Sequence, residues 1–355
     1  MTRFRVALAA AITALLVVSG GAVAVRTSAR PTTLAFIAGS RTSGAVPAAT
    51  PAVRPPGPNA LPLSNPKQLD AALTTLGYTV PPGAAVYAAK ISRDGGGLAY
   101  DDYQAGGGAL ASNFWPASSI KVLAAVGALE FVGALGFTGA ATIQSGSDTP
   151  RTIRSIYDSA IRTSSNPDYD LLVAIAGVDW LNNQFLTPAR GFPVTVIQKS
   201  YTEEGNVGDT PPLTIAEGGR TATIPARPAR TVTACAQANC STLFEMSESV
   251  RRVVLHDEIP EAERFRISRA DAAALTDALH GADGWFDPAV GQVLGSTARI
   301  YAKPGWVPDN DCLDVALIEA RGQRYLLSAT VPESMGGCPA LVSLAAGVLT
   351  LLTRG

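Results

Sequence analysis

The stretch that decides how this chain folds places a serine three residues before a lysine, at the start of an apolar run: Pro116-Ala117-Ser118-Ser119-Ile120-Lys121. Residues 117–132 are good helix formers, and side chains three apart on a helix lie on one face. The free N–H groups and the dipole of a first helical turn favour negative charge on a serine oxygen. A desolvated lysine beside that serine can lose its own proton and accept the serine's. The pattern predicts a nucleophile, Ser118, that needs no histidine.

The Ser-x-x-Lys spacing occurs a second time in the chain, so the spacing alone does not identify a nucleophile. Ser64 and Lys67 also stand three residues apart, but they lie in a proline-rich stretch with no predicted helix at its start. We interpret this second copy as accidental, because nothing there would hold the two side chains on one face. A Ser-x-x-Lys pair by itself is therefore a weak signal.

Two further short motifs follow at places where side chains can enter a cleft. Ser164-Ser165-Asn166 precedes a predicted helix, and Lys303-Pro304-Gly305 ends a predicted strand. Each has a plain structural interpretation. Asn166 can cap the helix with Pro167 in its first turn, and Pro-Gly is a common turn. However, two of the chain's five lysines fall inside the three motifs, which is hard to ascribe to chance.

The order Ser-x-x-Lys, Ser-x-Asn, Lys-x-Gly resembles the signature of the serine β-lactamases and penicillin-binding enzymes. The residues around the motifs agree with this, because 113–124 resembles the entry to the nucleophile helix of class A β-lactamases, and 152–166 and 171–177 resemble the helices on either side of their Ser-Asp-Asn turn. The resemblance covers about 70–200 and 240–355. It implies an α/β fold and a serine hydrolase that forms an acyl-enzyme.

The resemblance also implies a role for each motif residue. Ser118 would be acylated, Lys121 would accept its proton, and Ser164 would relay a proton to the leaving nitrogen. Asn166 would hold the side-chain amide of the substrate. The remaining residues implied as contacts of the substrate are Lys303 and Gly305, with an oxyanion hole formed by the backbone N–H groups of Ser118 and Trp306.

Three departures from the family pattern bear on turnover. Ser165 replaces the usual aspartate, and Pro304 replaces a threonine, which removes a hydroxyl that the family uses on the substrate carboxylate. The family's Glu-x-x-Leu-Asn loop, whose glutamate activates the deacylating water, is not recognisable. Where it should fall, the sequence offers Glu203 and Glu204 as possible deacylation bases. We therefore expect complete acylation machinery and uncertain deacylation.

The order of predicted elements indicates an α/β (α+β) fold in which the two ends of the folded part meet. A hairpin at 84–100 and strands at 297–302, 313–319 and 325–331 predict an antiparallel sheet flanked by helices. Between the strand groups the periodicity is helical, with a long irregular excursion at 201–239. We expect one β-lactamase-like domain at 69–355. Within it we expect an α/β part, formed by 69–104 and 291–355, and an inserted all-helical part at 105–290.

The N-terminus has the composition of a targeting segment. Residues 1–25 combine two early arginines, an apolar run and a final Ala22-Val23-Ala24, which indicate a signal peptide or an uncleaved anchor. Residues 26–68 form a proline-rich tether. We therefore expect an exported protein, secreted or tethered at the outer face of the cytoplasmic membrane, which it touches only through this segment.

Export changes how the four cysteines are interpreted. In an oxidising compartment an even number indicates disulfides, and four cysteines allow three pairings. Pairing of neighbours would close one tight loop and one of moderate length. A zinc site is the alternative, but there is no Cys-x-x-Cys and no accompanying histidine. We expect two disulfides and no metal, using Cys235, Cys240, Cys312 and Cys338.

Composition narrows the classes of partner. With 28 Lys+Arg against 29 Asp+Glu, the chain lacks the positive excess that nucleic-acid binding needs. We expect a monomer without a cofactor that acts on a small β-lactam or a peptidoglycan-derived substrate. The alternatives are a D,D-peptidase-like or esterase-like enzyme of the cell wall and a catalytically idle cell-wall-binding module.

Overall fold

The central element is a seven-stranded sheet in which strands from the two ends of the chain pair with each other. A computed structural model describes residues 63, 65–94, 97–229, 235 and 239–354, so the predicted targeting segment and nearly all of the tether lie outside the described residues. The strand order is β1-β3-β2-β11-β10-β8, with β9 also paired to β10. The strands are β1 (Lys67–Gln68), β2 (Ala85–Asp94), β3 (Gly97–Gly106), β8 (Arg299–Ala302), β9 (Gly305–Val307), β10 (Asp311–Ala320) and β11 (Gln323–Pro332).

The pairing of β11 with β2 confirms the expected closure of the fold. These two strands run antiparallel, with Ser328 opposite Tyr87, although they are separated by more than two hundred residues of sequence. Every other pair in this sheet is also antiparallel except β1 with β3. The sequence prediction of an antiparallel sheet built from N- and C-terminal strands is confirmed.

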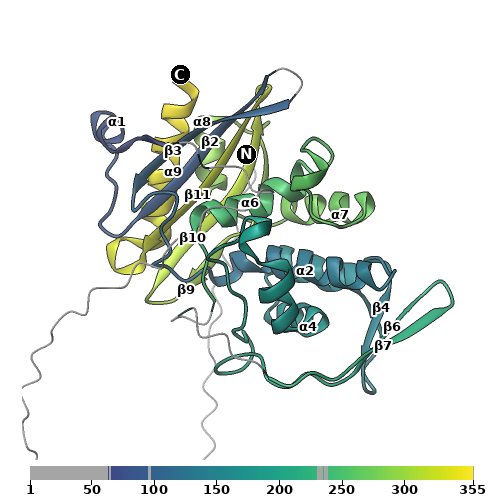
Figure 1. The fold of residues 1–355 in the computed structure, drawn as a ribbon. Helices are drawn as coiled ribbons and strands as arrows, with labels where there is room; N and C mark the ends of the chain where they lie inside the picture. The colour runs from purple at the N-terminus through teal and green to yellow at the C-terminus, as the bar shows by residue number, and fades with distance from the viewer. Residues whose placement is uncertain (1–62, 64, 95–96, 230–234, 236–238, 355) are drawn as a thin grey trace, which may run out of the picture. The chain divides into compact units, whose positions relative to one another are not determined.

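Both faces of this sheet are covered, which explains why β10 and β11 are buried almost throughout. In β10, Ala316 and Ile318 pack into a core formed with α8 (Asp287–Val293) and α9 (Gly337–Arg354), whereas Val315 and Leu317 pack into the other core. Successive side chains of a strand point to opposite faces. The short α1 (Asp70–Thr75) packs with α9, and α6 (Leu243–Val254) packs on the opposite side of the sheet (Figure 1).

The second core lies among the inserted helices. Its centre is α2 (Lys121–Ala134), which is apolar and buried on nearly all sides because other helices surround it. A helix that is hydrophobic all round belongs inside a protein or a membrane, and here it is packed in the core. The helices around it are α3 (Ile153–Arg162), α4 (Asn166–Ala176), α5 (Val178–Trp180), α6 and α7 (Arg269–His280).

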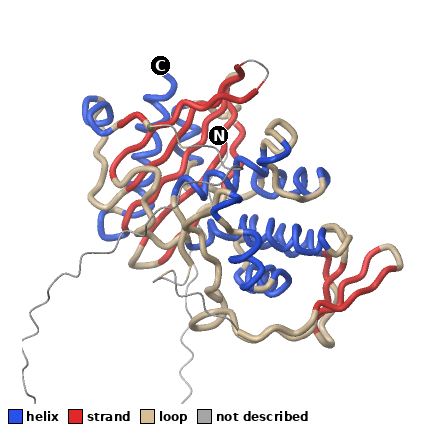
Figure 2. Tube along the Cα trace, viewed as in Figure 1, coloured by secondary structure: helices blue, strands red, loops and turns tan. Residues whose placement is uncertain are grey.

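The insertion is not all helical, so that part of the prediction is wrong. A separate four-stranded sheet has the order β5-β4-β6-β7 (Figure 2). Two of its strands lie in the stretch 201–239 that we expected to be irregular, joined by a Gly218-Gly219 turn in which both glycines have positive φ. The sheet forms because β6 pairs with a distant strand. Its members are β4 (Thr142–Ser145), β5 (Arg151–Thr152), β6 (Leu213–Glu217) and β7 (Arg220–Ile224).

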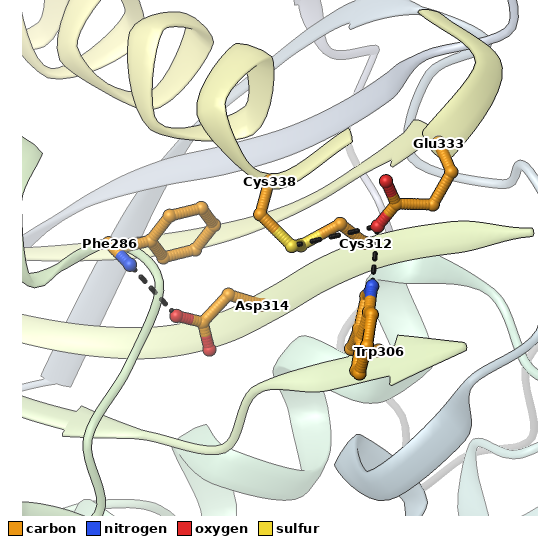
Figure 3. Close-up of a disulfide and its surroundings, with 6 residues drawn as sticks. All are labelled: Phe286, Trp306, Cys312, Asp314, Glu333 and Cys338. Carbon is orange, nitrogen blue, oxygen red and sulfur yellow. Dashed lines mark hydrogen bonds between the residues drawn. A yellow bond between two sulfur atoms is a disulfide. The ribbon is translucent and has the colours of Figure 1, made fainter. Parts of the chain in front are cut away.

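One of the two expected disulfides is present. Cys312 on β10 is bonded to Cys338 at the start of α9, which ties the sheet to the helix that covers it (Figure 3). Cys235 and Cys240 are thiols, so the expectation of a second disulfide is wrong for this structure. The Cys240 thiol is buried beside Val194, and its contact with Cys235 raises its pKa.

The single disulfide gives a stability prediction. Cys338→Ser should lower the free energy of unfolding by about 3 kcal/mol, because the bond closes a loop with a sequence separation of 26 and so constrains the unfolded chain. Denaturant unfolding of the variant measures this. Alkylation of the unfolded, unreduced protein should modify only Cys235 and Cys240; protection of all four sulfurs would show that a second bond forms.

Candidate active site

The predicted nucleophile lies in a tight turn at the entrance to α2. Ser118 belongs to a 3-10 turn, Ala117–Ile120, that runs directly into the helix. The residue before it, Ala117, has φ of 48°, a conformation that costs a non-glycine residue about 1 kcal/mol. The Ala117 carbonyl accepts a 2.6 Å hydrogen bond from the Tyr201 hydroxyl. Ser118 is half-buried and lines a cleft of about 400 Å³.

The lysine of the first motif contacts the second motif directly. The Lys121 side chain is fully buried, and its Nζ donates to the carbonyl oxygen of Ser164 at 2.6 Å and to Oδ1 of Asn166 at 2.7 Å. The Ser164 hydroxyl lies 3.3 Å from the same nitrogen. Ser164 also has positive φ, 58°, so its backbone turns sharply where it meets the lysine. Two motifs separated in sequence therefore form one hydrogen-bonded cluster.

The helix cap predicted at Asn166 is at Ser165 instead. The Ser165 hydroxyl accepts a hydrogen bond from the backbone N–H of Asp168 at the start of α4. Pro167 lies in the first turn, as expected. Because the neighbouring serine caps the helix, the Asn166 amide remains available to the cleft, which it lines.

The third motif adds a second buried lysine to the cluster. Lys303 follows β8, its side chain is 1% exposed, and its Nζ donates to the Ser164 hydroxyl at 3.1 Å. Ser164 Oγ thus lies between the amines of Lys121 and Lys303. Pro304 falls between β8 and β9, outside both strands, and its carbonyl lies 3.3 Å from the Lys303 amine. The sheet accommodates the proline because it needs no backbone N–H there.

Burial lowers the pKa of both lysines. Desolvation, with a further contribution from the charge on Lys303, lowers the pKa of Lys121 from 10.5 to about 7. Desolvation lowers the pKa of Lys303 to about 8, against the opposing effect of the Asp314 carboxyl. Asp314 is itself buried on β10, and burial raises its pKa to about 7. Near neutral pH, Lys121 is therefore able to exist as a neutral amine, which is the form that can accept a proton.

The glycine of the third motif permits close contact with the nucleophile turn. A Cβ atom at Gly305 would lie 2.8 Å from the Pro116 carbonyl oxygen and 3.1 Å from the Ala117 Cβ. Only glycine lets β9 approach the turn this closely. Trp306 follows on the same strand and lines the cleft together with Ser118. The structure thus brings Ser118, Gly305 and Trp306 together, as the sequence motifs predict.

Tyr201 lines the cleft and is held there by residues that the sequence analysis missed. Tyr201 stacks on Tyr169 with ring centroids 4.3 Å apart, and the Lys121 Nζ lies 5.5 Å from the centroid of the Tyr201 ring. The Asn239 amide donates to both tyrosine hydroxyls. Asp170 accepts hydrogen bonds from the backbone N–H groups of Tyr201 and Thr202. No motif spacing identifies these residues, because they come from α4, a loop and a distant segment.

The two glutamates proposed as deacylation bases lie at the rim of the same cleft. Glu203 and Glu204 are both exposed and line the cleft with Ser118. Among the residues that the structure describes, no carboxylate accepts a hydrogen bond from Lys121. The structure therefore brings Glu203 and Glu204 to the site without joining them to its lysine cluster.

Comparison with known proteins identifies the fold. No family model matches the chain, and no curated protein matches it. Solved structures do. A class A β-lactamase from Mycobacterium abscessus matches with a TM-score of 0.55 and 18% identity, over 80% of this chain and 99% of that one. A point mutant of PBP-A, in an acyl-enzyme complex with penicillin G, matches with a TM-score of 0.57 and 16% identity, over 82% and 100%. This chain has their fold.

An ancestral class A β-lactamase of Gram-negative bacteria gives the same result, with a TM-score of 0.56 and 19% identity over 81% of this chain and 99% of that one. At these identities the likeness establishes the arrangement of sheet and helices. The chemistry of this chain depends on its own residues.

The lowered lysine pKa values are directly measurable. In protein labelled with ¹³C at lysine Cε, NMR titration should give two of the five lysines midpoints near pH 7 and pH 8, and replacement of Lys121 or Lys303 should assign them. Lys303→Ala should raise the pKa of Lys121, because a neighbouring positive charge is removed. Exposed Lys67, whose pKa is raised by Asp101, is the internal reference. A Lys121 midpoint above about 10 would contradict this description of the site.

Proposed function

We propose that this protein is a serine hydrolase that forms an acyl-enzyme on Ser118 with a β-lactam or a related amide or ester. The observation that carries the proposal is the buried Lys121 amine, one helical turn after Ser118, with its pKa lowered to about 7 and its hydrogen bonds directed at Ser164 and Asn166. A buried amine that can become neutral near neutral pH is suited to activate a serine without histidine. The β-lactamase-like fold supports the same proposal.

In the proposed acylation, neutral Lys121 accepts the proton of the Ser118 hydroxyl as Oγ attacks the substrate carbonyl carbon. The carbonyl oxygen becomes negative and is stabilised by the backbone N–H groups of Ser118 and Trp306. The C–N bond then breaks, and the nitrogen leaves with the proton passed from Lys121 through the Ser164 hydroxyl. Lys303 remains positive and holds an acidic or polar group of the substrate. Lys121 must be neutral and Lys303 charged, so acylation should be fastest between about pH 7 and pH 8.

The proposed acyl-enzyme is long-lived. Hydrolysis of the ester needs a water that is held and deprotonated beside Ser118, usually by a carboxylate. On the side of the 199–204 loop, the Lys121 Nζ lies 5.5 Å from the centroid of the Tyr201 ring, which is an aromatic surface and not a base at neutral pH. Burial raises the pKa of Tyr201 further.

Slow release favours a penicillin-binding or D,D-peptidase-like role over efficient β-lactam destruction. A peptidase or transpeptidase uses the same acylation steps, with a cell-wall peptide as the acyl donor. The absence of a carboxylate among the described hydrogen-bond partners of Lys121 is the observation that favours this second candidate. An idle binding module would use the cleft but would take no covalent label.

We also propose that the protein acts outside the cytoplasmic membrane, secreted or tethered, as a monomer. The N-terminal composition and the Cys312–Cys338 disulfide support an oxidising compartment.

Covalent labelling tests the nucleophile. A fluorescent penicillin should label the full chain at Ser118, and Ser118→Ala should abolish the label without changing the melting temperature, because a half-buried hydroxyl contributes little to packing. Ser64→Ala, at the accidental copy of the motif, is the matched control and should keep full labelling. Loss of label in the control but not in Ser118→Ala would show that the assignment is wrong.

Pre-steady-state kinetics tests slow deacylation. With a chromogenic cephalosporin we expect a burst of one product per enzyme, followed by slow turnover. Glu203→Gln and Glu204→Gln should leave both phases unchanged, since neither carboxylate is hydrogen-bonded to Lys121. If one of them is the base, its loss should slow deacylation by about 100-fold while sparing the burst.

A further inference from the structure

Among the residues that the structure describes, the most exposed large apolar side chain belongs to a residue at the candidate active site. Trp306 is 52% exposed, and it lines the cleft that contains Ser118. It directly follows Gly305, the residue in closest contact with the nucleophile turn. Exposed tryptophan is uncommon away from binding surfaces, because its large apolar ring gains most free energy when buried. Packing within the protein therefore does not account for the exposed position of the Trp306 ring.

The exposed ring is held in one orientation. Its Nε1–H donates to Oε1 of Glu333 at 2.5 Å (Figure 3). Glu333 is itself held, because its backbone N–H donates to the Asn310 carbonyl at 2.8 Å. Fixing an exposed ring costs side-chain entropy that little burial offsets. A ring that is both exposed and fixed is prepared to contact something outside the protein.

The Glu333 carboxylate packs against the Cys312–Cys338 disulfide. The carboxylate oxygen that accepts from Trp306 lies 3.8 Å from Sγ of Cys338 in the disulfide, which has no proton to donate, so this is a packing contact. The partner cysteine, Cys312, lies directly opposite Trp306 where β10 pairs with β9. The disulfide thus braces the segment that carries Glu333 against the strand that carries Trp306.

The surroundings define the chemistry that would fit the ring. Three of the residues that line the cleft beside it, Trp115, Val307 and Pro308, are apolar or aromatic. Two carboxyl groups lie nearby, those of Glu333 and Asp311; the latter accepts from the backbone N–H of Trp115, and burial raises its pKa. Negative charge on Glu333 disfavours an anionic group at this end of the cleft.

We propose that the indole of Trp306 is the recognition platform for an uncharged planar aromatic or apolar group carried by the acyl substrate, and that Glu333 is the positioning residue that fixes it. This inference rests on the proposed function, since it names the substrate class of the same site. Stacking on a fixed ring should strengthen binding of an aryl-bearing substrate relative to one without the aryl group.

The test compares two substrates that differ only in the phenyl group, benzylpenicillin and 6-acetamidopenicillanic acid, which keeps the side-chain amide. The quantity measured is the ratio of their acylation efficiencies, followed by mass spectrometry of the full-length protein. In Trp306→Ala this ratio should fall about tenfold toward one, and in Trp306→Phe it should fall less, because a ring remains. Glu333→Gln should lower the ratio while leaving the melting temperature close to that of the wild type, which a merely structural role would not do.

Leu135→Ala is the matched control, since Leu135 is an exposed apolar side chain outside the cleft, and it should leave the ratio unchanged. Acylation by both compounds with an unchanged ratio in Trp306→Ala would overturn the inference and leave the proposed function standing. Failure of both compounds to acylate the wild-type protein would overturn the proposed function and the inference with it. Benzylpenicillin bound to Ser118→Ala should show the same dependence on Trp306 at equilibrium.

Discussion

The rest of the candidate site depends on one buried amine, that of Lys121. A buried ammonium must find acceptors for its N–H groups, and Lys121 finds them on the turn between α3 and α4. The contact fixes the start of α2 against that turn, and Lys303 brings the end of β8 to the same serine hydroxyl. Segments about 45 and 180 residues from Ser118 are thereby joined at one point.

This cluster carries costs that the surrounding core has to offset. Two amines share the Ser164 hydroxyl, and each disfavours positive charge on the other. Two non-glycine residues at the site, Ala117 and Ser164, have positive φ. Strain of this kind persists only where the surroundings over-determine the conformation. Here the largely buried α2 and the hydrogen bond from Tyr201 to Ala117 supply that constraint.

The sequence predicts the residues whose roles follow from local spacing. The three motifs, the main strands of the seven-stranded sheet and most helix positions are predictable, because periodicities of two and 3.6 residues and tight turns are local properties. The small sheet is not, because β6 gains its stability from β4, some seventy residues earlier. The sequence does not predict the positions of Asn239, Asp170 and Tyr201 for a similar reason. These residues contact one another across segments that are distant in sequence and share no motif. The second disulfide is not formed in this structure although Cys235 and Cys240 are in contact, and an even count of cysteines by itself does not decide whether two neighbouring thiols are bonded.

The hydrogen bonds of the loop at 198–202 explain why a tyrosine ring faces Lys121. Asn239 Oδ1 accepts from the backbone N–H groups of Gln198 and Lys199, while Asp170 holds those of Tyr201 and Thr202. With the loop fixed on both sides of Tyr201, its ring stays stacked on Tyr169 and faces Lys121. Glu203 and Glu204, two and three residues further along, are exposed at the rim of the cleft and do not accept a hydrogen bond from Lys121. In the acyl-enzyme proposed above, the packing of this loop, which places a tyrosine ring beside Lys121 and leaves its two glutamates at the rim of the cleft, would set how long the acyl group remains on Ser118.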